Sequence, residues 1–474
     1  MAALLVTFVV PVVLVRVLST AEYGQYAQII LLHGFFFRVL QFGLRQSLFY
    51  YLPTEKESRG YYVTNTFICF MAAGLIFFVI LTVFRDNLAY LFSADELAML
   101  LPLCGLHTLF MLVSSPFESI LIIDTKAERA SVVIFASEVM RGVIITSFVL
   151  TYRTLFSAVV GLVCYSFIRC IAYSFYVHKQ FGIKVDRDSL KHLKQQLDYA
   201  VPIGLSGIVG NTAKRLDKLI LAAFFTPEIY AVYAVGNFRA PLIKTFFTSV
   251  SEVVLPRTVK MLKDGKVDQF VEFWKKLLVR LFFVGCGAFF TLQLVAHDLI
   301  TLVFTSKFEA SVPVFRILLF LILGEMFRYG IILRTIGDTK AILKSNLLSF
   351  VVSIPLAFIL IPQFGLIGAA LAALSVNSIN IISQLTYSVI GLKKKVSDVF
   401  PVVTLFQLLG IGAALFLILW MVQQLIPYRV ARLVFSGTSF AFFYSVICGR
   451  AQIFNLFEEK LVRRVLVKLN FSRA

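Results

Sequence analysis

Charged residues are scarce in this sequence, and acidic residues are scarcer than basic ones. Only 15% of the 474 residues are charged, with 26 Asp and Glu against 45 Lys and Arg. Soluble globular proteins carry about 25% charged residues. The deficit excludes an ordinary soluble domain. The net charge of +19 does not indicate a nucleic-acid partner, because the placement of the charges decides what they bind.

Patterns that bind metals or cofactors are missing as well. The six cysteines are scattered through apolar segments without a Cys-x-x-Cys pair or a Cys/His cluster, so neither a disulfide framework nor a zinc site is expected. No nucleotide-binding motif is present. The first apolar segment lacks a basic start and a small-residue cleavage site, which predicts a helix and not a signal peptide. We expect no cofactor, no metal and no catalytic residue.

The chain is rich in long hydrophobic segments. Hydrophobic residues make up 59%, Phe alone contributes 49, and the mean hydropathy is +0.87. About 20 apolar residues suffice for a helix to span a bilayer. The fourteen candidate spans are 2–18, 26–52, 61–84, 98–123, 130–151, 155–177, 199–225, 229–255, 273–303, 312–333, 342–362, 366–391, 399–425 and 430–449. The sequence therefore predicts an all-α polytopic membrane protein.

Lys and Arg are distributed unevenly between the connecting loops. They gather in loops that follow even-numbered spans, such as 178–198 and 256–276, and are sparse in loops that follow odd-numbered spans. Basic residues stay on the cytoplasmic side of a membrane, so we expect both termini in the cytoplasm. The loops on the other side are too short to hold a catalytic domain.

Two short motifs occur twice along the chain. Thr-x-Glu followed by a Tyr/Ala pattern stands at 20–27 after the first span and at 226–234 after the seventh. Asp-Thr-Lys-Ala stands at 124–127 after the fourth span and at 338–341 after the tenth. In each pair, the second copy follows a span six places later than the first, which indicates a duplication of six spans. Since six spans return the chain to the same side, the repeats are parallel, with a pseudo-twofold arrangement about the membrane normal.

The repeat predicts the domain organisation. We expect an N-lobe at 1–198, whose segment 178–198 is a cytoplasmic amphipathic linker, and a C-lobe at 199–391. The last two spans form an appended helix pair at 392–450, and residues 451–474 form a basic cytoplasmic amphipathic tail.

These motifs together resemble one known family. The segments 18–27, 124–127, 217–221, 338–341 and 364–370 are similar to the oligosaccharide-flippase, or polysaccharide-transporter, branch of the multidrug/oligosaccharidyl-lipid/polysaccharide exporter superfamily. The resemblance covers nearly the whole chain and implies a V-shaped pair of lobes around a central cavity. The N-terminus departs from the family, which usually has more chain before its first loop.

The resemblance also implies a function. It is the flipping of undecaprenyl-diphosphate-linked oligosaccharide repeat units across the inner (plasma) membrane by alternating access, for surface polysaccharide biosynthesis. The implied partners are that lipid-linked oligosaccharide and the phospholipid bilayer, with polysaccharide polymerase and chain-length proteins as further candidates. Alternatives stay open: a lipid II (peptidoglycan precursor) flippase, a multidrug/cation antiporter of the same superfamily and, less favoured, a membrane glycosyltransferase or polymerase.

Polar side chains on one face of two predicted spans indicate a substrate-binding site. They follow the i, i+3, i+4, i+7 spacing of one helix face. The residues are Asn211, Lys214, Arg215 and Lys218 on 199–225, and Arg38, Gln41 and Arg45 on 26–52. A charge near the bilayer centre costs at least about 2.5–3.5 kcal/mol. The stripes are therefore expected to line a polar cavity for an anion, with pairing to acids on neighbouring helices as the alternative.

Other titratable residues inside the spans are weaker candidates. Arg239, Lys244 and Arg328 are further cavity cations, and Asp217 and Glu325 are candidates for ion coupling. Glu325 and Arg328 are spaced i, i+3, so they can also neutralise each other. His33, His107 and His297 are isolated in the sequence and are expected to be satisfied core or interface residues. Cations outnumber acids at depth, which favours a diphosphate over a cationic drug as cargo.

Overall fold

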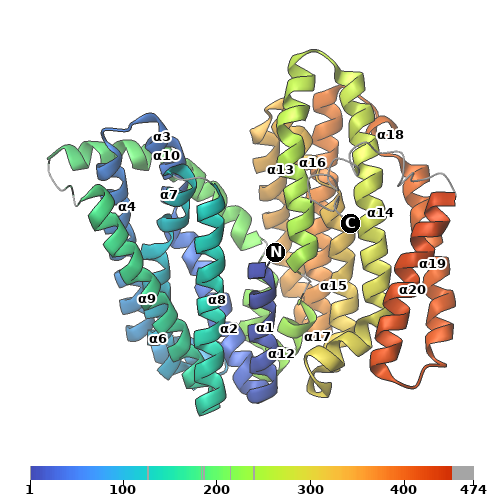
Figure 1. Ribbon diagram of the computed structural model, residues 1–474, viewed down its shortest axis with the longest axis horizontal. Coiled ribbons are helices and arrows are strands. Elements are labelled where there is room, and N and C mark those ends of the chain that lie inside the picture. Colours follow the sequence, from blue (N-terminus) through green and yellow to red (C-terminus); the bar gives the residue numbers. More distant parts are fainter. Residues whose placement is uncertain are drawn as a thin grey trace, which may run out of the picture. The chain divides into compact units, whose positions relative to one another are not determined.

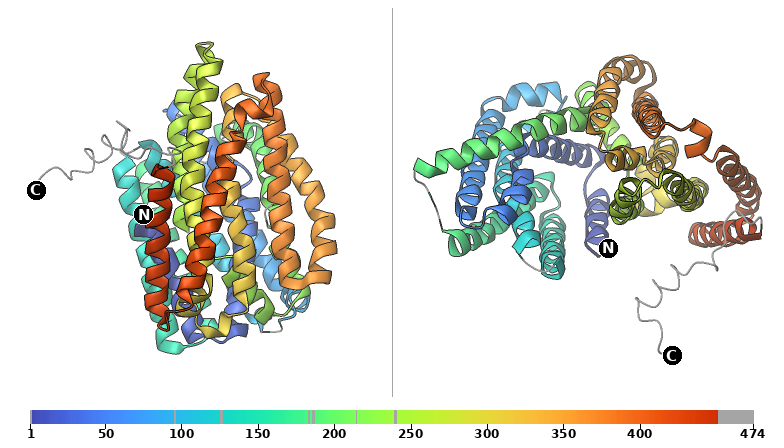
Figure 2. Two further views of the ribbon diagram at one scale, coloured as in Figure 1. Left: turned by 90° about the vertical axis from the view of Figure 1, so that its right-hand side faces the viewer. Right: turned by 90° about the horizontal axis from the view of Figure 1, so that it is seen from above.

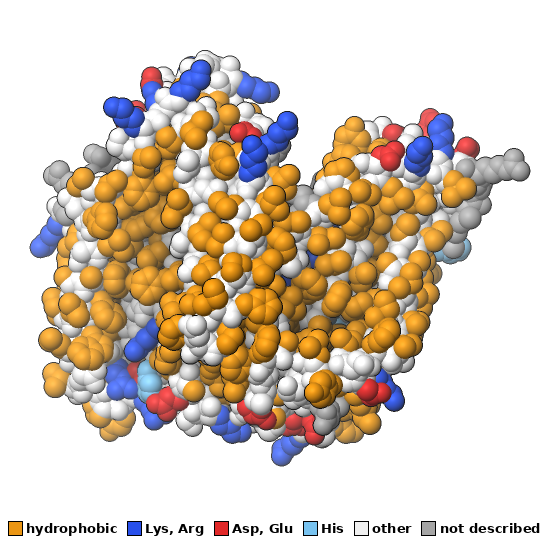
Figure 3. Space-filling model, turned by 180° about the vertical axis from the view of Figure 1, so that it is seen from behind, with side chains coloured by type: hydrophobic (Ala, Val, Ile, Leu, Met, Phe, Trp, Pro, Cys, Tyr) orange, Lys and Arg blue, Asp and Glu red, His pale blue; other side chains and the backbone are white. Residues whose placement is uncertain are grey.

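The computed structural model shows an all-helical protein. It describes residues 2–94, 96–124, 127–182, 184, 187–213, 215–238 and 241–450, and within these ranges it contains α-helices, one 3-10 helix and no strand. The predicted all-α fold is confirmed. Hydrophobic side chains cover the middle of the surface seen in Figure 3, and charged side chains gather toward its upper and lower ends. This distribution suits a membrane protein.

The chain forms two compact units. The first unit comprises Met1–Phe238, Val303–Val314 and Leu343–Val376, and the second comprises Arg239–Leu302, Phe315–Ile342 and Asn377–Ala474. The division into lobes at residues 198 and 391 stays a prediction.

The long helices of the first unit mostly run up and down beside one another, whereas α10 lies across one end of the unit (Figure 1). The helices of this unit are α1 (Ala2–Val17), α2 (Thr20–Gln41), α3 (Leu44–Thr54), α4 (Arg59–Val83), α5 (Arg85–Leu91), α6 (Leu97–Ser114), α7 (Pro116–Asp124), α8 (Ala127–Tyr152), α9 (Leu155–Phe181), α10 (Arg187–Ala213), α11 (Leu216–Phe224) and α12 (Pro227–Gly236). The 3-10 helix η1 (Ser306–Phe308) and part of α17 (Thr339–Leu392) also belong to this unit.

The second unit is a bundle of mostly long helices (Figure 2). They are α13 (Pro241–Lys263), α14 (Val267–Val303), α15 (Ser311–Met326), α16 (Tyr329–Ile336), the end of α17, α18 (Val396–Val399), α19 (Val402–Gln423) and α20 (Arg429–Arg450). The last two helices pack on α14, where Tyr444 stacks on Phe283 with ring centroids 5.1 Å apart. Arg432 of α20 also binds buried Asp298 of α14 through two nitrogens.

All fourteen predicted spans fall on helices, alone or as consecutive pairs. By length and composition alone, eight helices among the described residues could cross a membrane, or nine if the bent pair α2–α3 counts as one span. The long helix α17 covers two predicted spans. Gly365, with φ 56° and ψ −128°, breaks it between them, and this positive φ is one that glycine adopts without a steric cost.

Several predicted spans are broken internally. Four of the breaks, at Phe42-Gly43, after Ala213, after Gly236 and at Phe327-Arg328, lie at or beside a predicted cavity cation. Two others, at Ser115 and at Phe400-Pro401, do not. Non-helical backbone is tolerated at membrane depth only where protein buries it or a water-filled cavity borders it. The breaks therefore favour a polar interior at the cationic positions.

The repeated Thr-x-Glu segments begin helices and meet each other. Ser19 and Glu22 form a capping box at the start of α2, and Thr226 is the N-cap of α12. Gly24 lies directly against the Pro227 carbonyl group, where a Cβ atom would not fit. Buried Gln28 donates to the backbone oxygens of Phe92 at 3.4 Å and Ala222 at 3.3 Å. The repeated sequence thus packs α2 against α12.

The linker 178–198 begins with the last turn of α9, which ends at Phe181, and is helical again from Arg187, as the first half of α10. Leu190 on this helix is exposed, but polar contacts hold the helix to the unit. Fully buried Gln196 donates to Ser47 Oγ at 2.9 Å and to Thr66 Oγ1 at 2.7 Å. Leucine spacing alone does not reveal these bonds. The predicted tail at 451–474 lies outside the described residues.

Gly43 makes the bend of 44° between α2 and α3 possible, because φ is +78° there and its missing Cβ admits the backbone of Ala200 on α10. We expect Gly43→Ala to lower the free energy of unfolding by about 1–3 kcal/mol. The measurement is the thermal melting of the purified protein in detergent. Gly207→Ala is the matched control, since open space surrounds Gly207 within a helix; an equal effect of both substitutions would contradict this account.

Candidate functional site

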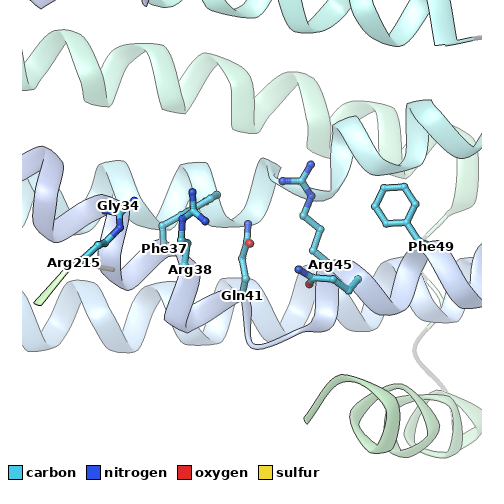
Figure 4. A pocket seen from close by; sticks show the side chains of 8 residues that line it. Gly34, Phe37, Arg38, Gln41, Arg45, Phe49 and Arg215 are labelled. Carbon is cyan, nitrogen blue, oxygen red and sulfur yellow. The ribbon is translucent and has the colours of Figure 1, made fainter. Parts of the chain in front are cut away.

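A cavity of about 500 Å³ lies beside the bend between α2 and α3 in the first unit (Figure 4). Its lining residues are Gly34, Phe37, Arg38, Gln41, Arg45, Gln46, Phe49 and Arg215. The volume is within the range of small-molecule sites. Four of the predicted site residues therefore line a single cavity, and no acid is among its lining residues.

Helical spacing explains why the side chains from α2 and α3 meet. Arg38, Gln41 and Arg45 follow i, i+3, i+7, and they project to the same side of the chain despite the bend (Figure 4). Arg215 approaches from the start of α11, which is a separate helix because α10 ends at Ala213. The prediction that residues 211–218 share the face of one continuous helix was wrong, since this break intervenes.

Arg38 and Arg215 give the cavity its charge. Among the described residues, no Asp or Glu forms an ion pair with either of them. The side chain of Arg38 is exposed, and Arg215 packs its guanidinium against Gly34, where an added Cβ would lie 2.8 Å from Nη1. The two guanidinium groups repel each other. An anion seated between them would relieve that repulsion.

Arg45 differs because an acid already binds it. Its Nη2 lies 3.1 Å from Glu118 Oε2, and its Nε donates to Ser119 Oγ at 2.8 Å. The second oxygen of Glu118 accepts from Arg169 Nη2 at 2.9 Å. Glu118 was not among the residues predicted from the sequence. Its depth in the membrane could have indicated the pairing, because Glu118 and Arg45 both lie close to the same end of their predicted spans.

Two predicted amide residues have a buried donor, but only Gln41 of the two lines the cavity. Gln41 is 9% exposed and lines the cavity, and its Nε2 has no hydrogen-bond partner among the described residues. Asn211 Nδ2 on α10 is likewise buried and unpartnered within the described part of the chain. Buried donors are normally hydrogen-bonded. Gln41 is therefore available to an oxygen of a bound molecule.

The remaining predicted residues lie elsewhere. Asp217 is buried and accepts from Tyr233 Oη at 2.6 Å, and Lys218 is half-buried on α11, outside the cavity lining. In the second unit Arg328 binds Glu325 at 2.9 Å and Thr248 Oγ1 at 3.1 Å, as the i, i+3 pairing predicts. Lys214, Arg239 and the side chain of Lys244 lie outside the described residues.

The histidines His33 and His107 have hydrogen-bond partners on neighbouring residues, as predicted, and their rings also contact each other. Their ring centroids lie 4.3 Å apart between α2 and α6. His33 Nδ1 lies 3.0 Å from Thr108 Oγ1, and His107 Nδ1 lies 3.1 Å from the Leu162 carbonyl oxygen. The contact joins two spans, so spacing within either span cannot reveal it.

Comparison with known proteins identifies the family. Residues 13–313 match the family described as polysaccharide biosynthesis protein. The chain belongs to this family. A curated relative is the capsular polysaccharide biosynthesis protein CapF of Staphylococcus aureus, which is 25% identical over 201 residues, or 41% of this chain. The match spans 50% of the length of that relative.

Solved structures share the fold. The lipid II flippase MurJ in an inward closed conformation has a TM-score of 0.74 and 17% identity, covering 95% of this chain and 99% of its own. An inward-facing multidrug resistance MATE transporter of the MOP superfamily has a TM-score of 0.61 and 14% identity, covering 83% and 93%. A Pyrococcus furiosus MOP transporter, described by the reverse polarity of its binding pocket, has a TM-score of 0.56 and 14% identity, covering 83% and 94%.

These findings confirm the resemblance inferred from the sequence. The chain belongs to the polysaccharide biosynthesis family and shares its fold with a lipid II flippase and with a multidrug resistance transporter of the MOP superfamily.

Gly34 provides a direct test of the cavity. In Gly34→Val the added methyl groups meet the flexible end of Arg215, so we expect Arg215 to be displaced while the fold persists. Binding of farnesyl diphosphate, measured by calorimetry in detergent, should weaken by about tenfold, the change that 1.4 kcal/mol produces. Gly410→Val on α19 is the control, because no atom lies within 4 Å of the Cβ position there. Undiminished binding in Gly34→Val would exclude Arg215 from the site.

Proposed function

We propose that this protein flips an oligosaccharide carried on undecaprenyl diphosphate across the plasma membrane for surface polysaccharide biosynthesis. The observation that carries the proposal is the cavity with two arginines, Arg38 and Arg215, with which no described acid forms an ion pair. A diphosphate offers charge-assisted hydrogen bonds to guanidinium groups. Family membership in polysaccharide biosynthesis supports a sugar as the rest of the cargo.

The transport step needs no covalent chemistry. The cavity takes the charged headgroup while the prenyl tail stays in lipid, and two conformations with different exposure of the cavity interconvert. In this proposal both termini are cytoplasmic and the cationic cavity first opens to that side. The breaks at Phe42-Gly43 and after Ala213 supply the hinges beside the cargo. A polymerase and chain-length proteins would receive the flipped product.

The other functions fit the cavity less well. A cationic drug would meet Arg38 and Arg215 and be repelled, and the Pyrococcus furiosus neighbour illustrates that pocket polarity varies on this fold. A glycosyltransferase would need acidic groups at the cavity, whose lining contains none. Lipid II also carries a diphosphate on a prenyl tail, so it is the chemically adjacent alternative, as for MurJ.

Ion coupling is a separate part of the proposal. Asp217 and Glu325 are the candidate groups, each already held by one partner: Tyr233 for the first and Arg328 for the second. A carboxylate can take up a cation or a proton when such a partner moves away.

The proposal predicts the effect of removing each free cation. Arg38→Gln and Arg215→Gln should each lower the flipping rate by about tenfold or more, because a charged hydrogen bond contributes about 1.5–3 kcal/mol. The measurement is the accessibility of lipid-linked oligosaccharide at the outer leaflet of proteoliposomes.

Arg85→Gln is the control variant. Arg85 is half-exposed and pairs with Asp86 at 3.6 Å, away from the cavity lining, so its loss should leave flipping unchanged. Wild-type rates in both Arg38→Gln and Arg215→Gln would refute the anionic-cargo proposal. Parallel vesicles that contain lipid II distinguish the two cargoes, since only the preferred one should be flipped rapidly.

A further inference from the structure

Glu118 connects one cavity arginine with one buried arginine. Its Oε2 lies 3.1 Å from Arg45 Nη2 at the cavity wall, and its Oε1 lies 2.9 Å from Arg169 Nη2. Each carboxylate oxygen thus serves one guanidinium. Arg169 is only 8% exposed and also donates to Tyr165 Oη at 3.3 Å, whereas the side chain of Arg45 is 27% exposed.

The two arginines are unequal partners of this acid. Breaking a buried ion pair is costly because it leaves a charge uncompensated. Arg169 is held in the interior and stays with Glu118, while Arg45 can turn to an anion that enters the cavity. After such an exchange Glu118 still has Arg169 and Arg45 has the new anion, so no charge is left without a partner.

We propose that Glu118 is a positioning residue that competes with the phosphate of the cargo for Arg45. In the empty cavity it holds Arg45 in place, and Ser119 fixes the same guanidinium through Nε. When the headgroup binds, Arg45 exchanges Glu118 for phosphate, and it returns when the headgroup leaves. The competition lowers the affinity for the cargo and speeds its release. This inference rests on the proposed function.

The exchange also changes a contact between helices. Arg45 lies on α3 just after the bend at Gly43, and Glu118 lies on α7 just after the break at Ser115. The Arg45–Glu118 and Arg45–Ser119 bonds tie these two short helices together. Loading the cavity would release the Arg45–Glu118 part of this tie, beside both helix breaks.

The test is a double-mutant cycle on purified protein in detergent, with farnesyl diphosphate as the probe. Glu118→Gln should bind the probe about three- to tenfold more tightly, because Arg45 no longer has a charged competitor. In the Arg45→Gln background the same substitution should change the affinity for the probe by less than twofold, because the arginine for which Glu118 and phosphate compete is absent. Flipping by Glu118→Gln should saturate at lower cargo concentration without a higher maximal rate.

Matched variants separate this exchange from other causes. Glu138→Gln removes the same charge from another ion pair of the first unit, Glu138–Arg141 at 2.6 Å, and should leave probe affinity within twofold of wild type. Glu118→Asp keeps the charge and should behave like the wild type. If Glu118→Gln does not fold, Ser119→Ala removes the neighbouring anchor of Arg45 and should tighten binding in the same direction.

The outcomes distinguish this inference from the proposed function. If the wild type does not bind the probe, the anionic-cargo proposal fails and the competition fails with it. If the wild type binds but Glu118→Gln, or its substitute Ser119→Ala, binds equally or more weakly, only the competition is refuted. Glu118→Gln could also tighten probe binding to the same extent in the Arg45→Gln background, or Glu138→Gln could tighten it equally. Either result would mean that the loss of one negative charge alone raises the affinity, and it would also refute the competition.

Discussion

An arginine inside a membrane protein needs either an anion or a water-filled space, and this requirement organises the first unit. The cost of burying a lone charge is at least about 2.5–3.5 kcal/mol at the bilayer centre. Arg169 and Arg45 meet the requirement by sharing Glu118. Arg38 and Arg215 meet it by facing a cavity of about 500 Å³. The proposed cargo is the anion that these last two arginines lack.

The broken helices follow from the same requirement. A continuous helix satisfies its own backbone, whereas a break exposes polar groups that need water or protein partners. The breaks at Phe42-Gly43 and after Ala213 therefore lie where the cavity already provides a polar environment. Gly34 and Gly43 allow the close approaches that complete it, one to Arg215 and the other to the backbone of α10. The cavity and its hinges are thus parts of one arrangement.

Much of the fold could be predicted from the sequence, because apolar length and loop charge report directly on membrane spans. Arg38, Gln41 and Arg45 could be placed together because their spacing lies within one span. The face predicted for residues 211–218 failed because periodicity assumes an unbroken helix, and α10 ends at Ala213. Glu118 and the His33–His107 contact were missed because they join different spans, and spacing along one span carries no information about its neighbours.

The central claim is that an anionic headgroup sits between Arg38 and Arg215. The most direct measurement is an experimental density map of the protein with a bound prenyl diphosphate. The account predicts phosphate density within hydrogen-bond reach of the guanidinium groups of both Arg38 and Arg215, beside Gly34. Phosphate density outside this cavity, with Arg38 and Arg215 paired to acidic side chains, would contradict it.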